Sequence, residues 1–292
     1  MARMTWLSVK KTANPGISRF RKGAARFLLL LFCLFSFSSE VFAMDVWITS
    51  PWLSVVANFM GGVFINVKPL GQWAEDGGIN KLSIKKVPAG SHFIALDYDE
   101  ALKYGIQSSQ KNLFVLYTHL PFSYEEADTY FTDPSVLPFI AQRIMNIFSS
   151  LDHEHYFFYQ RRLAEFQGRL ESTVLLGRQL LKGKKVFNLS KGFVEFLRAA
   201  QCEILHPEDE LWKEWAKGDS LDGLKQKIEE CRKNNVPVLF DMKSPVSIHK
   251  VLLESKSLGV VLLKYPDIGQ DIILSLYDQY LAIWNAASSG GS

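Results

Sequence analysis

The sequence predicts an α/β fold with two lobes, each with a mainly parallel four-stranded sheet flanked by helices, joined by one long α-helix. Three observations predict it. Strand-like and helix-like segments alternate through residues 44–152 and again through residues 183–287, as in parallel sheets with helices on their faces. Residues 153–182 keep an apolar stripe at helical spacing, long enough for a helix of about 40 Å. Residues 183–287 alone hold four strand–helix units, enough for a complete small domain.

The long helix joins two segments of different character. Its apolar stripe consists of Tyr156, Tyr159, Leu163, Phe166, Leu170 and Val174. No Gly or Pro lies between His153 and Gln167, and Gly168 alone does not break the pattern. A shorter apolar helix precedes it, and Asp133 and Pro134 are suited to its N-cap and first position. The stripe predicts that residues 153–182 form one helix that joins the lobes and is covered by both; we call it the strut. A surface helix of a single domain is the alternative.

The first 43 residues have the pattern of a secretory signal peptide. Seven basic residues precede the apolar run FLLLLFCLFSF, and Val41-Phe42-Ala43 is a suitable exit site. The run is too short to span a membrane comfortably. We therefore expect a periplasmic protein that begins near Met44, with an uncleaved anchor as the alternative.

Removal of this segment changes the charge of the chain. The whole chain has 33 basic and 30 acidic residues, and residues 1–43 contain seven of the basic and one of the acidic ones. The net charge of the rest of the chain is therefore about −3, which gives no reason to expect nucleic-acid binding. Cys202 and Cys231 remain in the exported part. A single disulfide between them is permitted outside the cytoplasm; neither has a C-x-x-C neighbour.

The elements follow one another in a regular order. In the first half we expect strands at 44–49, 64–70, within 81–102 and at 111–120, a turn at Ser50-Pro51, a helix within 51–62, and a polar loop at 72–80. In the second half we expect strands at 184–190, 202–206, 236–242 and 260–266, alternating with helices at 191–200, 221–235, 244–259 and 272–287. The last residues, 288–292, have the composition of a disordered tail.

Few residues of the sequence indicate a catalytic or ligand-binding role directly. His119 ends a predicted strand, at the carboxyl edge where α/β sheets bind ligands. The sequence has no nucleophile-and-base arrangement and no Gly-rich phosphate loop. We therefore do not expect an enzyme.

The chain resembles the solute-binding proteins of bacterial zinc and manganese ABC importers. The resemblance rests on VPAGSH, TDPSVLPFIAQRI, the spacing of Tyr159 and Phe166, KNNVPVLFDM and YPDIG. It implies two lobes of four parallel strands joined by a long helix. It also implies a metal held between the lobes by His side chains and a carboxylate, the donors that zinc and manganese accept.

The resemblance also implies a set of site residues. The first His of the family corresponds to His92. The places of the second and third hold Thr129 and Ser190, and the closing carboxylate corresponds to Tyr265 or Asp267. With His119 in place of a missing ligand, the predicted metal ligands are His92, His119 and Asp267. The further residues expected in the cleft are Thr129, Ser190 and Tyr265.

Two functions follow from these observations. The first is a monomeric, exported solute-binding component of an ABC importer, which delivers a divalent metal such as zinc or manganese to an inner-membrane permease. The second is a degenerate scaffold of the same kind that binds a non-metal ligand or acts as a protein-interaction factor. Hydroxyl groups at Thr129 and Ser190 suit the second better, because they bind polar organic molecules more readily than transition metals.

Overall fold

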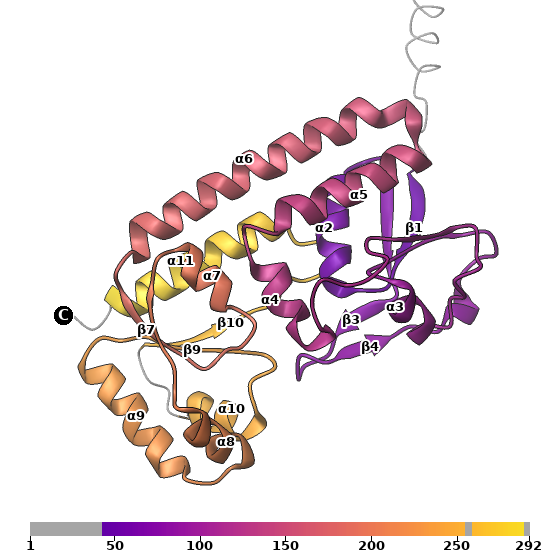
Figure 1. Cartoon of the computed structure of the whole chain (residues 1–292). Helices are drawn as coiled ribbons and strands as arrows, with labels where there is room; N and C mark the ends of the chain where they lie inside the picture. Colours follow the sequence, from indigo (N-terminus) through magenta and orange to yellow (C-terminus); the bar gives the residue numbers. More distant parts are fainter. Residues whose placement is uncertain (1–42, 255–258, 289–292) are drawn as a thin grey trace, which may run out of the picture. The chain divides into compact units, whose positions relative to one another are not determined.

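Two parallel four-stranded sheets form the centres of two lobes (Figure 1). The computed structural model describes residues 43–254 and 259–288. The strand order is β2-β1-β5-β6 in the N-terminal sheet and β10-β9-β7-β8 in the C-terminal sheet. Both sheets thus have the same order, with the first strand of each next to its third. The predicted fold class is confirmed.

The N-terminal lobe alternates strands and helices. Its strands are β1 (Met44–Ile48), β2 (Ile65–Pro69), β5 (His92–Ala95) and β6 (Leu113–Val115), with a separate hairpin of β3 (Gly71–Trp73) and β4 (Ile79–Lys81). Its helices are α2 (Pro51–Gly61), α3 (Tyr98–Lys103), α4 (Ala127–Thr132) and α5 (Leu137–Leu151), with short 3-10 turns η1 (Ile84–Lys86) and η2 (Tyr124–Glu126).

The C-terminal lobe repeats the alternation. Its strands are β7 (Lys185–Asn188), β8 (Glu203–Leu205), β9 (Val238–Asp241) and β10 (Val260–Leu263). Its helices are α7 (Val194–Ala199), α8 (Asp209–Lys217), α9 (Leu221–Lys233), α10 (Val246–Glu254) and α11 (Ile272–Ser288).

The predicted strut is present as one helix. A 3-10 turn, η3 (His153–His155), leads into α6 (Tyr156–Leu181), which continues through Gly168. α11 runs beside α6 along the same side of the molecule (Figure 1). At the crossing, a Cβ on Gly177 would lie 2.6 Å from Cε2 of Tyr280, so only glycine lets the two helices approach this closely.

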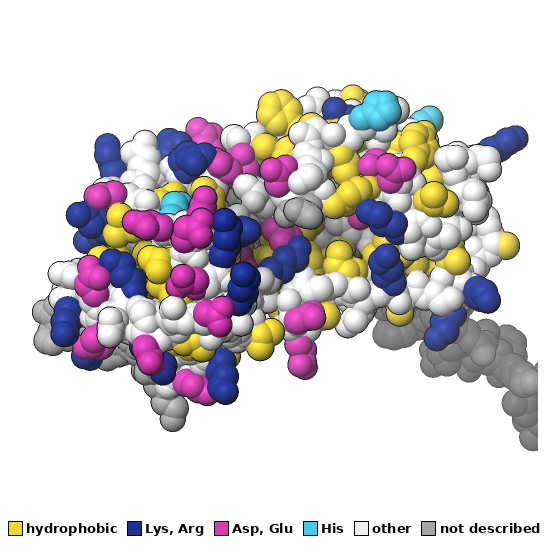
Figure 2. Space-filling view, turned by 60° about the horizontal axis from the view of Figure 1, so that its bottom comes forward, with side chains coloured by type: hydrophobic (Ala, Val, Ile, Leu, Met, Phe, Trp, Pro, Cys, Tyr) yellow, Lys and Arg dark blue, Asp and Glu magenta, His cyan; other side chains and the backbone are white. Residues whose placement is uncertain are grey.

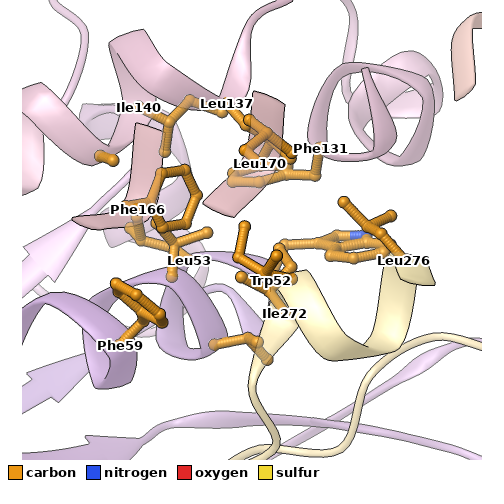
Figure 3. Packing of buried hydrophobic residues seen from close by; sticks show 14 of the residues in the cluster. Trp52, Leu53, Phe59, Phe131, Leu137, Ile140, Phe166, Leu170, Ile272 and Leu276 are labelled. Atoms are coloured by element: carbon orange, nitrogen blue, oxygen red, sulfur yellow. The ribbon is translucent and has the colours of Figure 1, made fainter. Parts of the chain in front are cut away.

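One apolar core is continuous through both lobes. Figure 3 shows Trp52 among Leu170 of α6, Phe131 of α4 and side chains of α11. Leu239 of β9 and Leu263 of β10 belong to the same cluster. Because the two lobes share this core, they are joined by buried side chains as well as by the strut.

Two local predictions were wrong. The helix α5 begins at Leu137, and Asp133 instead accepts a hydrogen bond from the Ser135 N–H at 2.8 Å, so that residues 133–136 form a turn. The segment predicted as a polar loop at 72–80 contains the hairpin of β3 and β4. An Asp-Gly pair is a known hairpin signal, and Asp76-Gly77 lies in this turn.

The structure also bears on the predicted membrane topology and on the two cysteines. Among the described residues no helix is long and apolar enough to cross a membrane. Cys202 and Cys231 are both free thiols. The signal peptide predicted for residues 1–43 lies, except for Ala43, outside the described residues.

Candidate functional site

The carboxyl ends of both sheets face one another, and side chains from both lobes meet there. We call five of them the interlobe cluster: Trp52, Trp73, Asp128, Lys243 and Tyr265. Trp52 follows β1 in the first turn of α2, which is capped by Ser50. The loops after β9 and β10 supply Lys243 and Tyr265. In parallel sheets this edge is where ligands bind.

Asp128 is the centre of the cluster. Asp128 lies on α4, and the residue is only 4% exposed. Its Oδ1 accepts a hydrogen bond from Trp52 Nε1 at 2.8 Å, and its Oδ2 accepts one from the Tyr265 hydroxyl at 2.9 Å. Lys243 Nζ lies 2.5 Å from the same Oδ2. The buried negative charge is thus compensated by one ammonium group and two neutral donors, as a buried carboxylate requires.

Aromatic rings pack around the Asp128 side of this ion pair. The ring centroids of Trp52 and Tyr265 are 5.2 Å apart, and those of Trp73 and Tyr265 are 4.8 Å apart. Trp73 Nε1 donates across the lobes to the Pro266 carbonyl at 3.3 Å. The pKa of Tyr265 is raised, first by burial and then by the carboxylates of Asp128 and Asp241. The phenol therefore stays protonated and donates to Asp128.

A second buried carboxylate lies at the end of β9. Oδ2 of Asp241 accepts hydrogen bonds from the Ser190 hydroxyl and, at 3.4 Å, from the Gly192 N–H. Its Oδ1 accepts one from the Lys243 N–H at 2.9 Å. Ser190 follows β7, the neighbour of β9, so this contact closes the crevice at the point where the strand order reverses.

The helix α4 fixes the loop after β7. The Thr129 hydroxyl donates to the Lys191 carbonyl at 3.0 Å, and the Thr132 hydroxyl donates to the Gly192 carbonyl. These bonds join the N-terminal lobe to the C-terminal lobe directly.

The structure brings three of the six predicted site residues to this face. Thr129, Ser190 and Tyr265 all make hydrogen bonds at the interlobe contact. Each uses its hydroxyl group to bond another part of the protein.

The other three lie elsewhere. The sequence predicts His92 in a loop facing the other lobe, but it is the first residue of β5, at the amino end of the strand. Its Nδ1 is buried with no hydrogen-bond partner within the described residues. His119 is exposed in the loop after β6, and Asp267 is exposed after β10. A metal-ligating role for His92, His119 and Asp267 stays a prediction.

The residues of the interlobe contact do not fit a zinc or manganese ion. Every carboxylate oxygen of Asp128 and Asp241 already accepts a hydrogen bond from the protein. Zinc and manganese sites need free imidazole or carboxylate donors. Through residues 43–254 and 259–288, no group of three or more His, Cys, Asp or Glu side chains could hold a metal ion.

Sequence reasoning missed Asp128, Lys243, Trp52, Trp73 and Asp241. Asp241 could have been found, because it ends a predicted strand at the carboxyl edge, as His119 does. Asp128 is next to Thr129, so the predicted position was one residue from the central carboxylate. The two Trp residues and Lys243 carry no motif.

No family model and no curated protein matches the sequence. Solved structures do match the fold. The crystal structure of ZnuA has a TM-score of 0.61 at 19% identity, over 84% of this chain and 100% of that chain. The structure of the SBP FpvC from Pseudomonas aeruginosa in complex with Mn²⁺ has a TM-score of 0.56 at 13% identity, over 85% of this chain and 100% of that chain.

A third structure is similar. It is the laminin-binding protein Lmb of Streptococcus agalactiae, described as a bifunctional protein with adhesin and metal transporting activity. It has a TM-score of 0.57 at 15% identity, over 82% of this chain and 100% of that chain. At these identities the likeness shows the fold: the chain has the two-lobe fold of metal-binding solute-binding proteins.

Proposed function

We propose that this chain is the exported binding component of an ABC importer whose interlobe site takes no metal cargo, because an internal lysine occupies the central carboxylate. The fold supports the first part. The observation that carries the second is the 2.5 Å contact between Lys243 Nζ and Asp128 Oδ2. A metal ion at this carboxylate would need to displace an ammonium group that compensates the same charge.

The cargo is then a non-metal solute, and the partner is an inner-membrane permease that recognises the closed lobes. Three cross-lobe contacts support a closed arrangement without a metal: Asp128–Tyr265, Trp73–Pro266 and Thr129–Lys191. No ligand atom is needed to bridge the lobes, since the side chains themselves do so. We expect the protein to act in the periplasm as a monomer, without catalysis.

Metal import is the second candidate. It is favoured by the structures with the same fold, one of which is described as metal transporting. In that case His92, His119 and Asp267 would be the protein's ligands for zinc or manganese. His92 and His119 lie at opposite ends of the N-terminal sheet, because β5 and β6 are parallel. A rearrangement within this lobe, besides a movement of the lobes, would be needed to bring the three residues together.

Calorimetry separates the two. The metal-stripped chain that begins at Met44 is titrated with Zn²⁺ and with Mn²⁺, beside a variant with His92→Ala and His119→Ala. We expect no saturable binding to either protein. Tight one-to-one binding to the parent that is lost in the double variant would establish the second candidate and contradict the proposal.

A further inference from the structure

A cavity of about 660 Å³ lies beside the interlobe contact, in the C-terminal lobe. It lies over the carboxyl ends of β7 and β8 and is bounded by α8. The residues that give it chemical character are Ser190, Lys191, His206, Trp212, Lys213 and Lys217. Its volume is in the range of small-molecule sites, and it lies at the edge of the sheet where α/β proteins bind ligands.

The charged groups of the lining favour an anion. The lining includes three lysines, Lys191, Lys213 and Lys217, and one carboxylate residue, Asp209. Lys213 is also 3.6 Å from Glu210 in an exposed ion pair, which water screens. Figure 2 shows charges of both signs interspersed over the C-terminal lobe, at the left of the view. The excess of positive charge is therefore a local property of the cavity lining.

The apolar part of the lining favours a flat ligand. Trp212 is half-buried and packs against an apolar cluster of the C-terminal lobe that is separate from the shared core and includes Leu189 and Trp215. Leu189, Pro207 and Ala216 continue the apolar wall of the cavity. Lys191 Nζ lies 5.9 Å from the centroid of the Trp212 ring. An anionic group beside Lys191 would thus bring an attached ring against the face of Trp212.

The cavity is coupled to the contact between the lobes. Lys191 follows Ser190, and its carbonyl accepts the hydrogen bond from Thr129 of the N-terminal lobe. Ser190 itself lines the cavity and donates to Asp241. A ligand in the cavity would therefore contact the loop that α4 holds.

We propose that this cavity binds a planar organic carboxylate, with its ring on Trp212 and its carboxylate at Lys191. This proposal names the class of solute that the importer would carry. Only the role of the solute as transported cargo rests on the function proposed above. The ammonium groups recognise the charge, and Trp212 recognises the ring.

The experiment uses matched pairs of probes on the chain that begins at Met44. Benzoate, nicotinate and indole-3-acetate are compared with their neutral amides by calorimetry and saturation-transfer NMR. We expect at least one acid to bind about tenfold more tightly than its amide, which corresponds to one charge-assisted hydrogen bond. Equal affinity of acid and amide, or no binding of any acid at millimolar concentration, would overturn the proposal. So would binding of inorganic phosphate as tight as that of the acids.

Variants test the named residues. Trp212→Leu and Lys191→Gln should each weaken binding of the acid by about tenfold, whereas Trp212→Phe should retain most of it. The matched controls are Trp284→Leu on α11 and Lys225→Gln on α9, which do not line the cavity, and neither should change the affinity. Circular dichroism checks that each variant is folded. Losses in the controls equal to those in the cavity variants would contradict the assignment.

The two proposals fail separately. Binding of Zn²⁺ or Mn²⁺ in calorimetry would contradict the proposed function and leave the carboxylate site standing. Absence of carboxylate binding would contradict this site and leave the interlobe ion pair standing.

Discussion

Lys243 Nζ lies 2.5 Å from Oδ2 of Asp128, and the two residues come from different lobes. The carboxylate is almost fully buried, whereas 40% of the lysine side chain is exposed. The pair therefore joins the two lobes through a buried carboxylate and a partly exposed ammonium group. Its energetic role can be measured.

Replacement of Lys243 by Ala should destabilise the protein by about 1–3 kcal/mol, because it leaves the Asp128 charge buried without an ion partner. The effect should be smaller than for a fully buried pair, since solvent reaches the lysine. Urea unfolding measures it. As the control, Lys225→Ala removes an exposed lysine that pairs with Asp222 at 3.0 Å, and the change in free energy should stay within about 0.5 kcal/mol. Equal effects of the two variants would show that the Lys243 pair adds no stability.

Two glycines of the strut should respond in opposite ways to replacement by Ala. Gly177→Ala places a Cβ 2.6 Å from the ring of Tyr280, which is fully buried and stacked on Phe196 at 4.1 Å. Overpacking of this kind costs about 1–3 kcal/mol. A Cβ on Gly168 meets no atom of the described residues within 4 Å, so Gly168→Ala should stabilise the helix by about 0.5–1 kcal/mol. Thermal unfolding of both variants tests the packing of α11 on α6, and a neutral Gly177→Ala variant would contradict it.

Glu100 predicts a dependence of stability on pH. Its pKa is raised mainly by burial; the Thr49 hydroxyl and the Leu96 N–H, which both donate to it, oppose this. A raised pKa means that the folded state prefers the neutral acid. The stability that Glu100 contributes is therefore fully present below its unfolded pKa of about 4.5 and is lost as the pH rises through the folded value.

Glu100→Gln removes this dependence while its amide oxygen can still accept hydrogen bonds. The free energy of unfolding of the variant, relative to that of the parent, should increase between pH 4 and pH 8. Urea unfolding at several pH values gives the difference. A constant difference across this range would show that Glu100 titrates normally.

Export is predicted from the sequence alone. Protein recovered from its native envelope should begin at Met44 or within a few residues of it, because Val41-Phe42-Ala43 is the best exit site. Mass spectrometry of the intact protein decides this. Retention of the basic residues from Arg3 to Arg26 would contradict it.

The fold could be predicted because periodicity marks its elements directly. The alternation through residues 183–287 gave all four strands of the C-terminal sheet, and the stripe from Tyr156 gave α6. The site could not be predicted to the same degree. Tyr265 and Asp128 are 137 residues apart in the chain, and no local pattern links them.

The charged residues of the site carry no local signal either. Lys243 lies in a polar turn, where a lysine is normally solvated. Asp128 has the sequence context of a surface helix. Trp73, which reaches the other lobe, ends β3 of a hairpin in a segment whose sequence predicts a polar loop. Burial and pairing across the lobes decide these roles, and they depend on the whole fold.

Lys243 occupies the Asp128 carboxylate, which leaves this carboxylate no free donor for a metal ion at the interlobe contact. A crystal structure of the chain that begins at Met44, grown with Zn²⁺ and measured at the zinc absorption edge, tests it most directly. The ion pair predicts no anomalous peak among Asp128, Asp241 and Tyr265, with Lys243 Nζ still against Asp128. A zinc peak at Asp128 with the lysine side chain displaced would contradict it.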